Sequence, residues 1–445
     1  MAVNAVVAQS GGPTAVINNS VRGVVEALHE SPDVDRVYGG RMGILGVLRN
    51  ELIDLTAQDH EQIRLLGETP SAGALGSCRY KLASKDTGER YHEDYARILD
   101  VFKAHNVGMF FYIGGNDSMD TANRVAALAR EQGLDVQGIG VAKTVDNDVG
   151  GPLQEDGTFA VCDHNPGYGS VARYWAVNVL EANEENKASH TSDPVLIMQA
   201  MGRKIGFITA SARLADPERR MPLLIIMPEA LSKDDPQANL EFITGHVNQR
   251  LQQSGRCIVV LTEGANLGDV GVLRDAFGHA QFSACRTTAA HLLMNHLNGM
   301  DRQDEKGRAQ SRLAVPGIAR VDVPGTLQRR DIARASSVDL EEAYGVGAHA
   351  ARLALDGKSG VMATILRRPA EPYAVGYGEV PLGEVANAER SFPAEWIAES
   401  RVDVTDGFVE WARPLIGEPL PEFTRLEAQM APDGGLPDYT PQGMR

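Results

Sequence analysis

Short apolar runs recur along the chain, and most end in a glycine-rich turn followed by a segment with apolar residues at helical spacing. The first two such units comprise strands at 3–8 and 107–113, turns at 10–14 and 114–118, and helices at 15–29 and 119–132. Further strands are predicted at 137–142, 195–200, 223–227, 257–262 and 312–320. Strands that alternate with helices predict an α/β fold whose mainly parallel sheets are covered on both faces.

Glycine and proline junctions indicate how this chain of 445 residues divides. Gly150-Gly151-Pro152 and Pro324-Gly325 are the candidate boundaries. We expect two Rossmann-like, doubly wound domains with the active site in the cleft between them, followed by a C-terminal extension whose prolines from Pro414 onward indicate a loose tail. The predicted ranges are 1–152 with about 327–365, then 153–326, then 366–445.

Composition narrows the possible partners. The chain has 43 Lys and Arg against 59 Asp and Glu, a net charge of −16, and no basic run, which disfavours nucleic acid. No apolar run approaches the ~20 residues of a membrane span, and the N-terminus lacks a basic region before its apolar stretch, so we interpret it as a strand. The four cysteines have no CxxC spacing, which favours a cytoplasmic protein without a zinc site or disulfide framework.

The two Gly-Gly turns are candidate phosphate sites. Such turns at strand ends expose backbone N–H groups beside a helix N-terminus, where an anion is favoured. Gly11-Gly12 and Gly114-Gly115 both have this setting, although ordinary tight turns are the alternative. Neither turn is a Walker A or GxGxxG motif, which disfavours ordinary P-loop or dinucleotide binding.

An acidic turn follows the predicted strand at 137–142, at the end of a parallel strand where ligands bind. It contains Thr144, Asp146 and Asp148. One carboxylate would accept a proton from a substrate hydroxyl, and the other would hold Mg²⁺ against a transferring phosphoryl group. A solvated acidic turn is the alternative. Met201-Gly202-Arg203 and Pro228-Glu229 follow other strands and would add a cation and a sugar partner at the same edge.

Seven motifs between residues 3 and 360 follow one another in the order found in the 6-phosphofructokinases, and the chain resembles the pyrophosphate-dependent type of that family. The motifs are Ser10-Gly11-Gly12 with Asn18, Gly76-Ser77-Cys78-Arg79, Gly114-Gly115-Asn116-Asp117-Ser118, Lys143-Thr144-Val145-Asp146-Asn147-Asp148, Met201-Gly202-Arg203, Pro228-Glu229 and Leu327-Gln328-Arg329. The resemblance implies reversible transfer of phosphate from pyrophosphate to the 1-hydroxyl of fructose 6-phosphate, with a donor domain at the N-terminus and a sugar domain after it.

The resemblance also implies roles for single residues. Asp146 would be the base, with Thr144 beside it, while Arg203, the Gly12 N–H and Lys143 would act on the phosphoryl group. Arg79, Asn116, Asp117 and Ser118 would complete the donor site, and Asn116 and Asp148 would hold Mg²⁺. Met201, Gly202 and Glu229 would hold the sugar, and Arg320 and Arg329 its 6-phosphate. Because the residue that matches Arg320 acts across a subunit interface in the family, a homodimer or homotetramer is expected.

Two positions indicate which donor is used. Asp117 and Lys143 stand where ATP-using relatives carry glycine, so the carboxylate would repel the α-phosphate of a nucleotide and the ammonium would bind pyrophosphate. Three features depart from the family pattern. Asn116 stands in the place of a frequent aspartate, Thr326 stands in the place of a histidine or tyrosine, and the segment 190–194 lacks the arginine of many relatives. An ATP-dependent enzyme, a sedoheptulose-7-phosphate kinase and a non-catalytic sugar-phosphate sensor are the alternatives.

Overall fold

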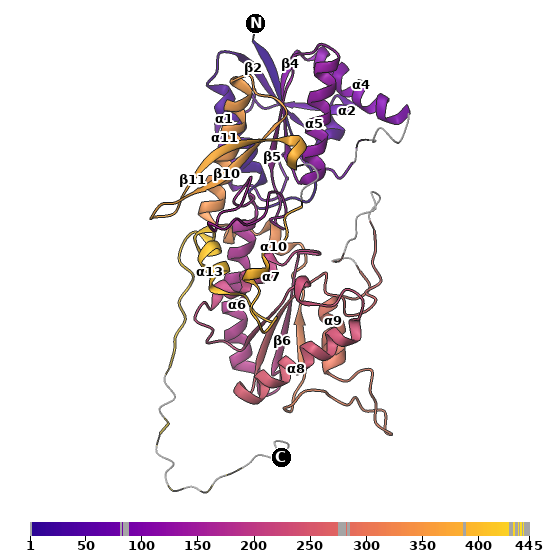
Figure 1. Cartoon of the computed structure of the whole chain (residues 1–445), viewed down its shortest axis with the longest axis vertical. Helices are drawn as coiled ribbons and strands as arrows, with labels where there is room; N and C mark the ends of the chain where they lie inside the picture. The colour runs from indigo at the N-terminus through magenta and orange to yellow at the C-terminus, as the bar shows by residue number, and fades with distance from the viewer. Residues whose placement is uncertain are drawn as a thin grey trace.

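The chain folds around two β-sheets (Figure 1). The computed structural model describes residues 2–80, 82, 89–274, 282, 285–385 and 389–426, with 430, 431, 435, 437 and 439 beyond them. In the first sheet the order is β11-β10-β5-β4-β1-β2-β3, and in the second it is β7-β8-β6-β9. All described pairings are parallel except β2 with β3 and β10 with β11. The predicted α/β class with mainly parallel sheets is confirmed.

The strands of the first sheet are β1 (Val3–Gln9), β2 (Val34–Gly40), β3 (Leu52–Asp54), β4 (Val107–Gly114), β5 (Gln137–Ala142), β10 (Val361–Arg368) and β11 (Ala374–Pro381). Its helices are α1 (Ile17–His29), α2 (Ile44–Arg49), α3 (His60–Arg64), α4 (Glu89–Ala104), α5 (Asn116–Glu131), α11 (Ser337–Leu355) and α12 (Leu382–Val385). Because side chains alternate along a strand, Ala5 and Val7 of β1 pack with α1 and α11, whereas Val6 and Ala8 pack with α2, α4 and α5.

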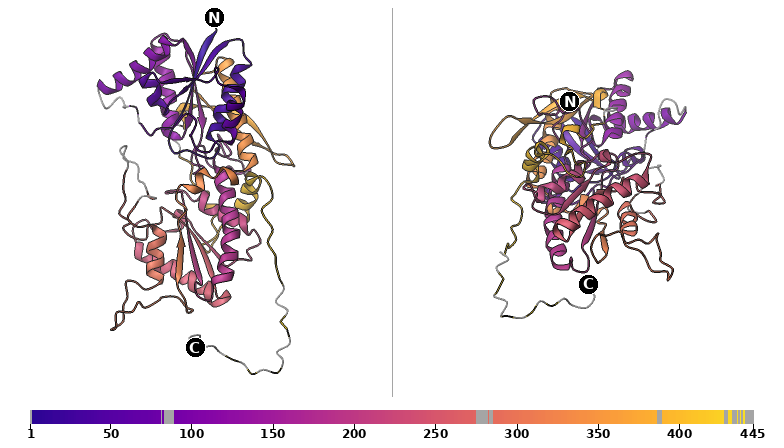
Figure 2. Two further views of the ribbon diagram at one scale, coloured as in Figure 1. Left: turned by 180° about the vertical axis from the view of Figure 1, so that it is seen from behind. Right: turned by 60° about the horizontal axis from the view of Figure 1, so that its bottom comes forward.

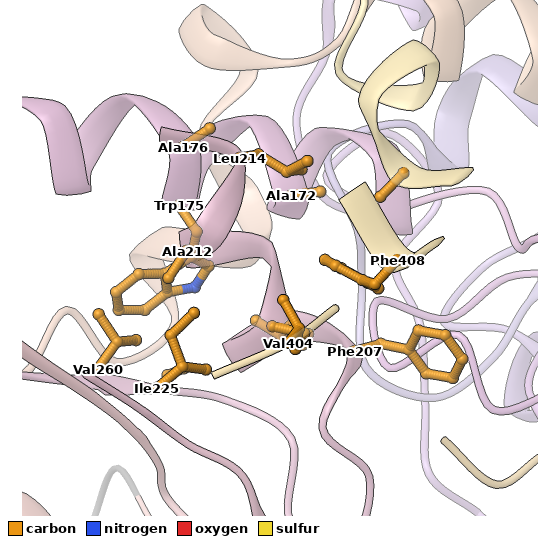
Figure 3. Close-up of a cluster of buried hydrophobic side chains, with 14 of the residues drawn as sticks. Ala172, Trp175, Ala176, Phe207, Ala212, Leu214, Ile225, Val260, Val404 and Phe408 are labelled. Carbon is orange, nitrogen blue, oxygen red and sulfur yellow. The ribbon is translucent and has the colours of Figure 1, made fainter. Parts of the chain in front are cut away.

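The second sheet consists of β6 (Val195–Ala200), β7 (Leu223–Ile226), β8 (Cys257–Thr262) and β9 (Ala319–Asp322). The remaining helices are α6 (Tyr168–Ser189), α7 (Phe207–Ala210), α8 (Pro236–Ser254), α9 (Ala289–Leu297), α10 (Leu327–Arg330) and α13 (Asp406–Ala412). One face of the sheet packs on α8 and α9 and the other on α6. Figure 3 shows this second core, where Trp175 of α6 lies near Ile225 and Val260 of the sheet.

The C-terminal extension is part of the folded body as far as residue 416. Its strand β11 joins the first sheet, and its aromatic side chains Phe392, Trp396, Phe408 and Trp411 are buried in the core of the second. After Gly417 the chain leaves the body, and no helix or strand is found in its described part (Figure 2). The loose tail expected from Pro414 onward and the domain limits at 152, 326 and 365 stay predictions.

Three predicted elements differ from the structure, and one of them is the helix expected at 119–132, which spans Asn116–Glu131. The strand expected at 312–320 is displaced to 319–322, because Pro316 lacks an amide hydrogen and Gly317 adopts a φ of 124°, which interrupts an extended run. The helix expected from Ala15 begins at Ile17, because the preceding segment stays irregular while buried Thr14 packs against Gly167. No helix in the described chain is both long and apolar enough to span a bilayer.

Candidate active site

The carboxyl ends of strands from both sheets open on one cavity of about 480 Å³. Residues that directly follow β1, β4, β5, β6 and β8 line it, which is where open α/β sheets bind ligands. The predicted site residues on its lining are Gly12, Arg79, Asn116, Asp117, Ser118, Lys143, Thr144, Asp146, Asp148, Met201, Arg203 and Arg329. The structure thus brings together most of the predicted residues, although they come from distant parts of the chain.

Three cationic side chains gather at the Gly11-Gly12 turn. The ammonium of Lys143 is 3% exposed and donates a hydrogen bond to the Gly12 carbonyl (2.6 Å). A methyl group on Gly12 would lie 2.9 Å from Nη1 of Arg329 and 3.5 Å from Nη2 of Arg79. Burial and the neighbouring Arg329 lower the pKa of Lys143 to about 7. Such a group of cations is suited to a multiply charged anion.

The Gly-Gly turns use their backbone differently from the sequence-based expectation. The N–H of Gly11 donates to the carbonyl of Cys78 (2.9 Å), so it does not point at a ligand, and the φ of Gly11 is 75°. At the second turn Gly115 is the N-cap of α5, and Asn116, Asp117 and Ser118 form the first helical turn on the cavity wall. The N-terminus of α5, a helix of 16 residues, therefore faces the cavity beside the cations.

The acidic turn after β5 is held in a strained, well-bonded conformation. The backbone N–H of Asp146 donates to the Thr144 hydroxyl (3.1 Å), and Asn147 adopts a left-handed φ of 57°. Asn147 keeps this conformation because its Oδ1 accepts from the N–H of Asn165 (3.0 Å). Burial and the nearby Asp148 raise the pKa of Asp146 to about 7, which suits a general base at neutral pH.

Two oxygen atoms on the lining have no hydrogen-bond partner among the described residues. They are Oδ1 of Asn116 and Oδ1 of Asp148, and both are buried. Burial also raises the pKa of Asp148, while the Thr144 hydroxyl acts in the opposite direction. Oxygen atoms of this kind are the ligands that Mg²⁺ takes from proteins, usually few in number and completed by water and phosphate. Accordingly, the described residues hold no group of three or more His, Cys, Asp or Glu that would form an all-protein metal site.

The wall formed by the second sheet carries Met201, Arg203 and Glu263. The Met201 N–H donates to Oε1 of Gln328 (2.9 Å), which also accepts from the indole of Trp175 (2.9 Å). Sequence reasoning missed Glu263, although it directly follows the strand at 257–262 and so has the same signal as Asp146. Burial and the charge of Asp146 raise the pKa of Glu263 to about 7.

Three predicted residues lie off the lining. Glu229 accepts from the N–H of Gly206 (3.0 Å) and so braces the loop after β6. Gly202 takes a φ of 100° in the same loop. Arg320 is 54% exposed and pairs with Asp193 at 3.0 Å. Arg329, which the family resemblance assigns to the sugar phosphate, lies beside Gly12 at the donor turn.

Two parallel sheets that open on one cavity, with a half-buried carboxylate beside clustered cations, are what a phosphotransferase needs. The family model Phosphofructokinase matches residues 4–353, and the chain belongs to the phosphofructokinase family. It is 37% identical over 445 residues to the pyrophosphate–fructose 6-phosphate 1-phosphotransferase of Methylococcus capsulatus, covering 98% of this chain and 95% of the relative. The enzyme of the same name from Halomonas elongata is 38% identical, with 94% and 93% covered.

Solved structures give the same result. The crystal structure of a pyrophosphate-dependent phosphofructokinase from Nitrosospira multiformis matches with a TM-score of 0.77 and 35% identity, covering 99% of this chain and 96% of that one. The predicted family is confirmed.

Proposed function

We propose that the protein transfers a phosphoryl group from pyrophosphate to the 1-hydroxyl of fructose 6-phosphate and catalyses the reverse reaction as well. The observation that carries this proposal is the buried ammonium of Lys143 at the Gly12 carbonyl, on the same cavity as Asp146. A compact cation there suits a donor that is all phosphate. The names of the most similar relatives support the same donor and acceptor.

In the forward reaction Asp146 accepts the proton of the 1-hydroxyl. The oxygen so released forms a bond to one phosphorus of pyrophosphate, the P–O bond to the bridging oxygen breaks, and inorganic phosphate leaves with the electron pair. Lys143, Arg79 and Arg203 hold the charge on the phosphoryl oxygens, and electrostatic stabilisation of this kind dominates phosphoryl transfer. In the reverse direction Asp146 returns the proton to the sugar oxygen.

The donor site rejects ATP, in this proposal, through Asp117. Its carboxylate lies in the first turn of α5 on the cavity wall, where it would meet the α-phosphate of a nucleotide. Like-charge repulsion then disfavours ATP more than pyrophosphate, because pyrophosphate has no α-phosphate at this place. Gly12 and Ser118 complete this wall.

Magnesium fits Oδ1 of Asn116 and Oδ1 of Asp148, which have no hydrogen-bond partner in the part of the chain that the structure describes. When bound, Mg²⁺ neutralises charge on the pyrophosphate oxygens during transfer. Asn116 supplies a neutral amide oxygen, so Asp148 is the charged ligand of the pair.

The remaining parts of the proposal concern assembly and location. Arg320 is exposed and does not line this cavity, which supports the proposal that it serves the site of a second subunit in a homodimer or homotetramer. The four cysteines form no disulfide, in accord with a cytoplasmic enzyme.

The test offers pyrophosphate and ATP in parallel to the purified protein, with fructose 6-phosphate and Mg²⁺, and follows fructose 1,6-bisphosphate. We expect kcat/KM for pyrophosphate to exceed that for ATP by at least roughly tenfold. Asp146→Asn should lose about 10²–10⁴ of the activity while it still binds the sugar phosphate. A preference for ATP, a faster reaction with sedoheptulose 7-phosphate, or sugar-phosphate binding without any product would support one of the three alternatives instead.

A further inference from the structure

A segment of the C-terminal extension lies directly behind the acidic turn. Glu389 pairs with Val149 in an antiparallel bridge, and the backbone N–H of Arg390 donates to the carbonyl of Asp148 (2.9 Å). Both residues lie outside the range 4–353 that the family model matches. The turn that carries the proposed base and metal ligand is therefore bonded to a part of the chain far from it in sequence.

The side chain of Arg390 is a buried cation at this junction. It is 4% exposed, and its guanidinium donates to the carbonyls of Asp163 (2.9 Å) and Cys162. It also lies 4.1 Å above the ring of Phe159. A side chain on Gly150, the second residue after Asp148, would collide with the guanidinium, and the φ of this glycine is 140°. The guanidinium thus fills the space between the acidic turn and residues 162–163.

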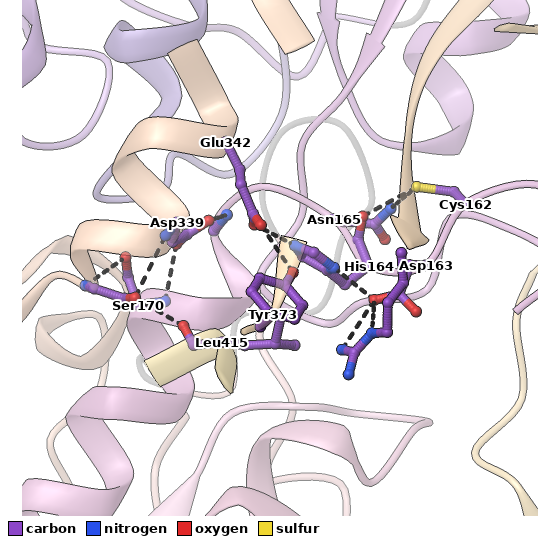
Figure 4. A network of polar contacts seen from close by, with 12 residues as sticks. Cys162, Asp163, His164, Asn165, Ser170, Asp339, Glu342, Tyr373 and Leu415 are labelled. Carbon is purple, nitrogen blue, oxygen red and sulfur yellow. Dashed lines mark hydrogen bonds and ion pairs between the residues drawn. The ribbon is translucent and has the colours of Figure 1, made fainter. Parts of the chain in front are cut away.

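The segment on the other side of Arg390 is itself anchored. The amide of Asn165 donates to the Val149 carbonyl (2.9 Å) and its oxygen accepts from the Val149 N–H (3.0 Å). His164 lies between Asp163 (2.8 Å) and Glu342 of α11 (2.6 Å), as Figure 4 shows. Residues 162–165 therefore form a fixed layer against which Arg390 holds the turn.

Burying an arginine without a close carboxylate partner costs stability, and an apolar side chain of similar volume would fill the same space at a lower cost. The guanidinium of Arg390 donates to the carbonyls of Asp163 and Cys162 in the layer behind the turn, and the backbone N–H of the same residue donates to the carbonyl of Asp148. The guanidinium thus holds its own segment on the layer, and that segment in turn holds the acidic turn. This is a geometric task that a planar guanidinium performs better than a flexible ammonium.

We propose that Arg390 is a positioning residue of the reaction, one that fixes the Asp146–Asp148 turn from behind and so sets the place of the base and the metal ligand. This inference rests on the proposed function of that turn. A displacement of about 1 Å in a reacting group can cost about 10² in rate, so the effect should appear in kcat. Arg390 does not line the cavity, so KM should change little.

The test compares Arg390→Met and Arg390→Lys with a matched control, Arg213→Met. Arg213 is also buried (1% exposed) but bonds to Asp403 (2.8 Å) and does not line the cavity. We expect kcat to fall by at least about tenfold in Arg390→Met, with KM for fructose 6-phosphate within about threefold of wild type. Arg390→Lys should recover part of kcat, and Arg213→Met should lower the thermal midpoint without lowering kcat of the folded fraction.

Two results would overturn the inference. One is a wild-type kcat in folded Arg390→Met. The other is a loss of activity in Arg390→Met that is fully explained by a smaller fraction of folded protein, as expected for Arg213→Met. If Arg390→Met does not fold, the test depends on Arg390→Lys. A wild-type kcat and KM in Arg390→Lys would refute the role of the planar guanidinium. The wild-type rate with pyrophosphate is measured first, so that failure of the proposed function is distinguished from failure of this inference.

Discussion

Replacing Lys143 by methionine removes a buried charge from the donor site and keeps most of the side-chain volume. The ammonium is 3% exposed and lies at the turn where Arg79 and Arg329 also gather. Loss of one partner of a buried charge contact costs roughly 2–5 kcal/mol. Since about 1.4 kcal/mol corresponds to a factor of ten, kcat/KM for pyrophosphate should fall by about 30-fold to about 4,000-fold at pH 6.

The pH dependence makes this prediction specific. Burial lowers the pKa of Lys143 to about 7, so the free protein loses this cation as the pH rises through 7. The ratio of wild-type to Lys143→Met kcat/KM should therefore shrink by about tenfold between pH 6 and pH 8. Titration of pyrophosphate itself cancels in the ratio, because both proteins use the same donor.

The assay measures kcat/KM for pyrophosphate at saturating fructose 6-phosphate across this pH range. The control is Lys187→Met, in which an exposed lysine of α6 that pairs with Glu184 is replaced, and it should match wild type. A variant Lys143→Met with wild-type kcat/KM, or a ratio that does not change with pH, would refute the role of Lys143 in donor recognition.

Three further predictions concern the donor wall and the buried network. Asp117→Gly should give measurable turnover with ATP while activity with pyrophosphate drops only modestly, and an unchanged donor ratio would contradict the repulsion argument. Gly12→Ala should raise KM for pyrophosphate by about tenfold, because the added methyl group would lie 2.9 Å from Nη1 of Arg329 and displace that side chain. An unchanged KM would count against a role of Arg329 in binding the donor. Although burial opposes it, the carboxylates of Glu342 and Asp163 raise the pKa of His164 from 6.5 to about 9. The resulting stabilisation, about 3 kcal/mol, is complete below pH 6.5 and lost as the pH rises to 9, so urea unfolding should show this decline in wild type but not in His164→Gln.

The predicted site residues that line the cavity share one local signal. Lys143, Asp146 and Asn116 follow buried strands within a few residues, and the ends of parallel strands meet at one edge of a sheet. Glu263 has the same signal and was missed only because a single acidic residue after a strand is common. Local pattern was therefore sufficient to find the edge but not every residue on it.

What the sequence did not predict depends on contacts between distant segments. Strand β11 pairs with β10, and Phe408 packs in the second core, although neither feature has a strong local pattern within the predicted extension. The displaced strand β9 shows the reverse problem, because the apolar residues at 312–318 looked like a strand while Pro316 and Gly317 prevented one. Arg390 could not be connected with Asp148 at all, since no periodicity joins residues so far apart.

The strain at the acidic turn explains why the extension is built into the body. Asn147 is left-handed, Asp146 is a half-buried carboxylate, and Oδ1 of Asp148 lacks a partner among the described residues, and each of these features costs stability on its own. Such a turn persists only when its surroundings fix it more strongly than its own preferences oppose it. Asn165 and Arg390 do this through the side chain of Asn147 and the backbone of Asp148 and Val149, so these bonds do not use the carboxylates of Asp146 and Asp148. The aromatic core around Phe408 then stabilises the segment that supplies Arg390, so packing far from the cavity offsets the cost of keeping the turn ready for catalysis.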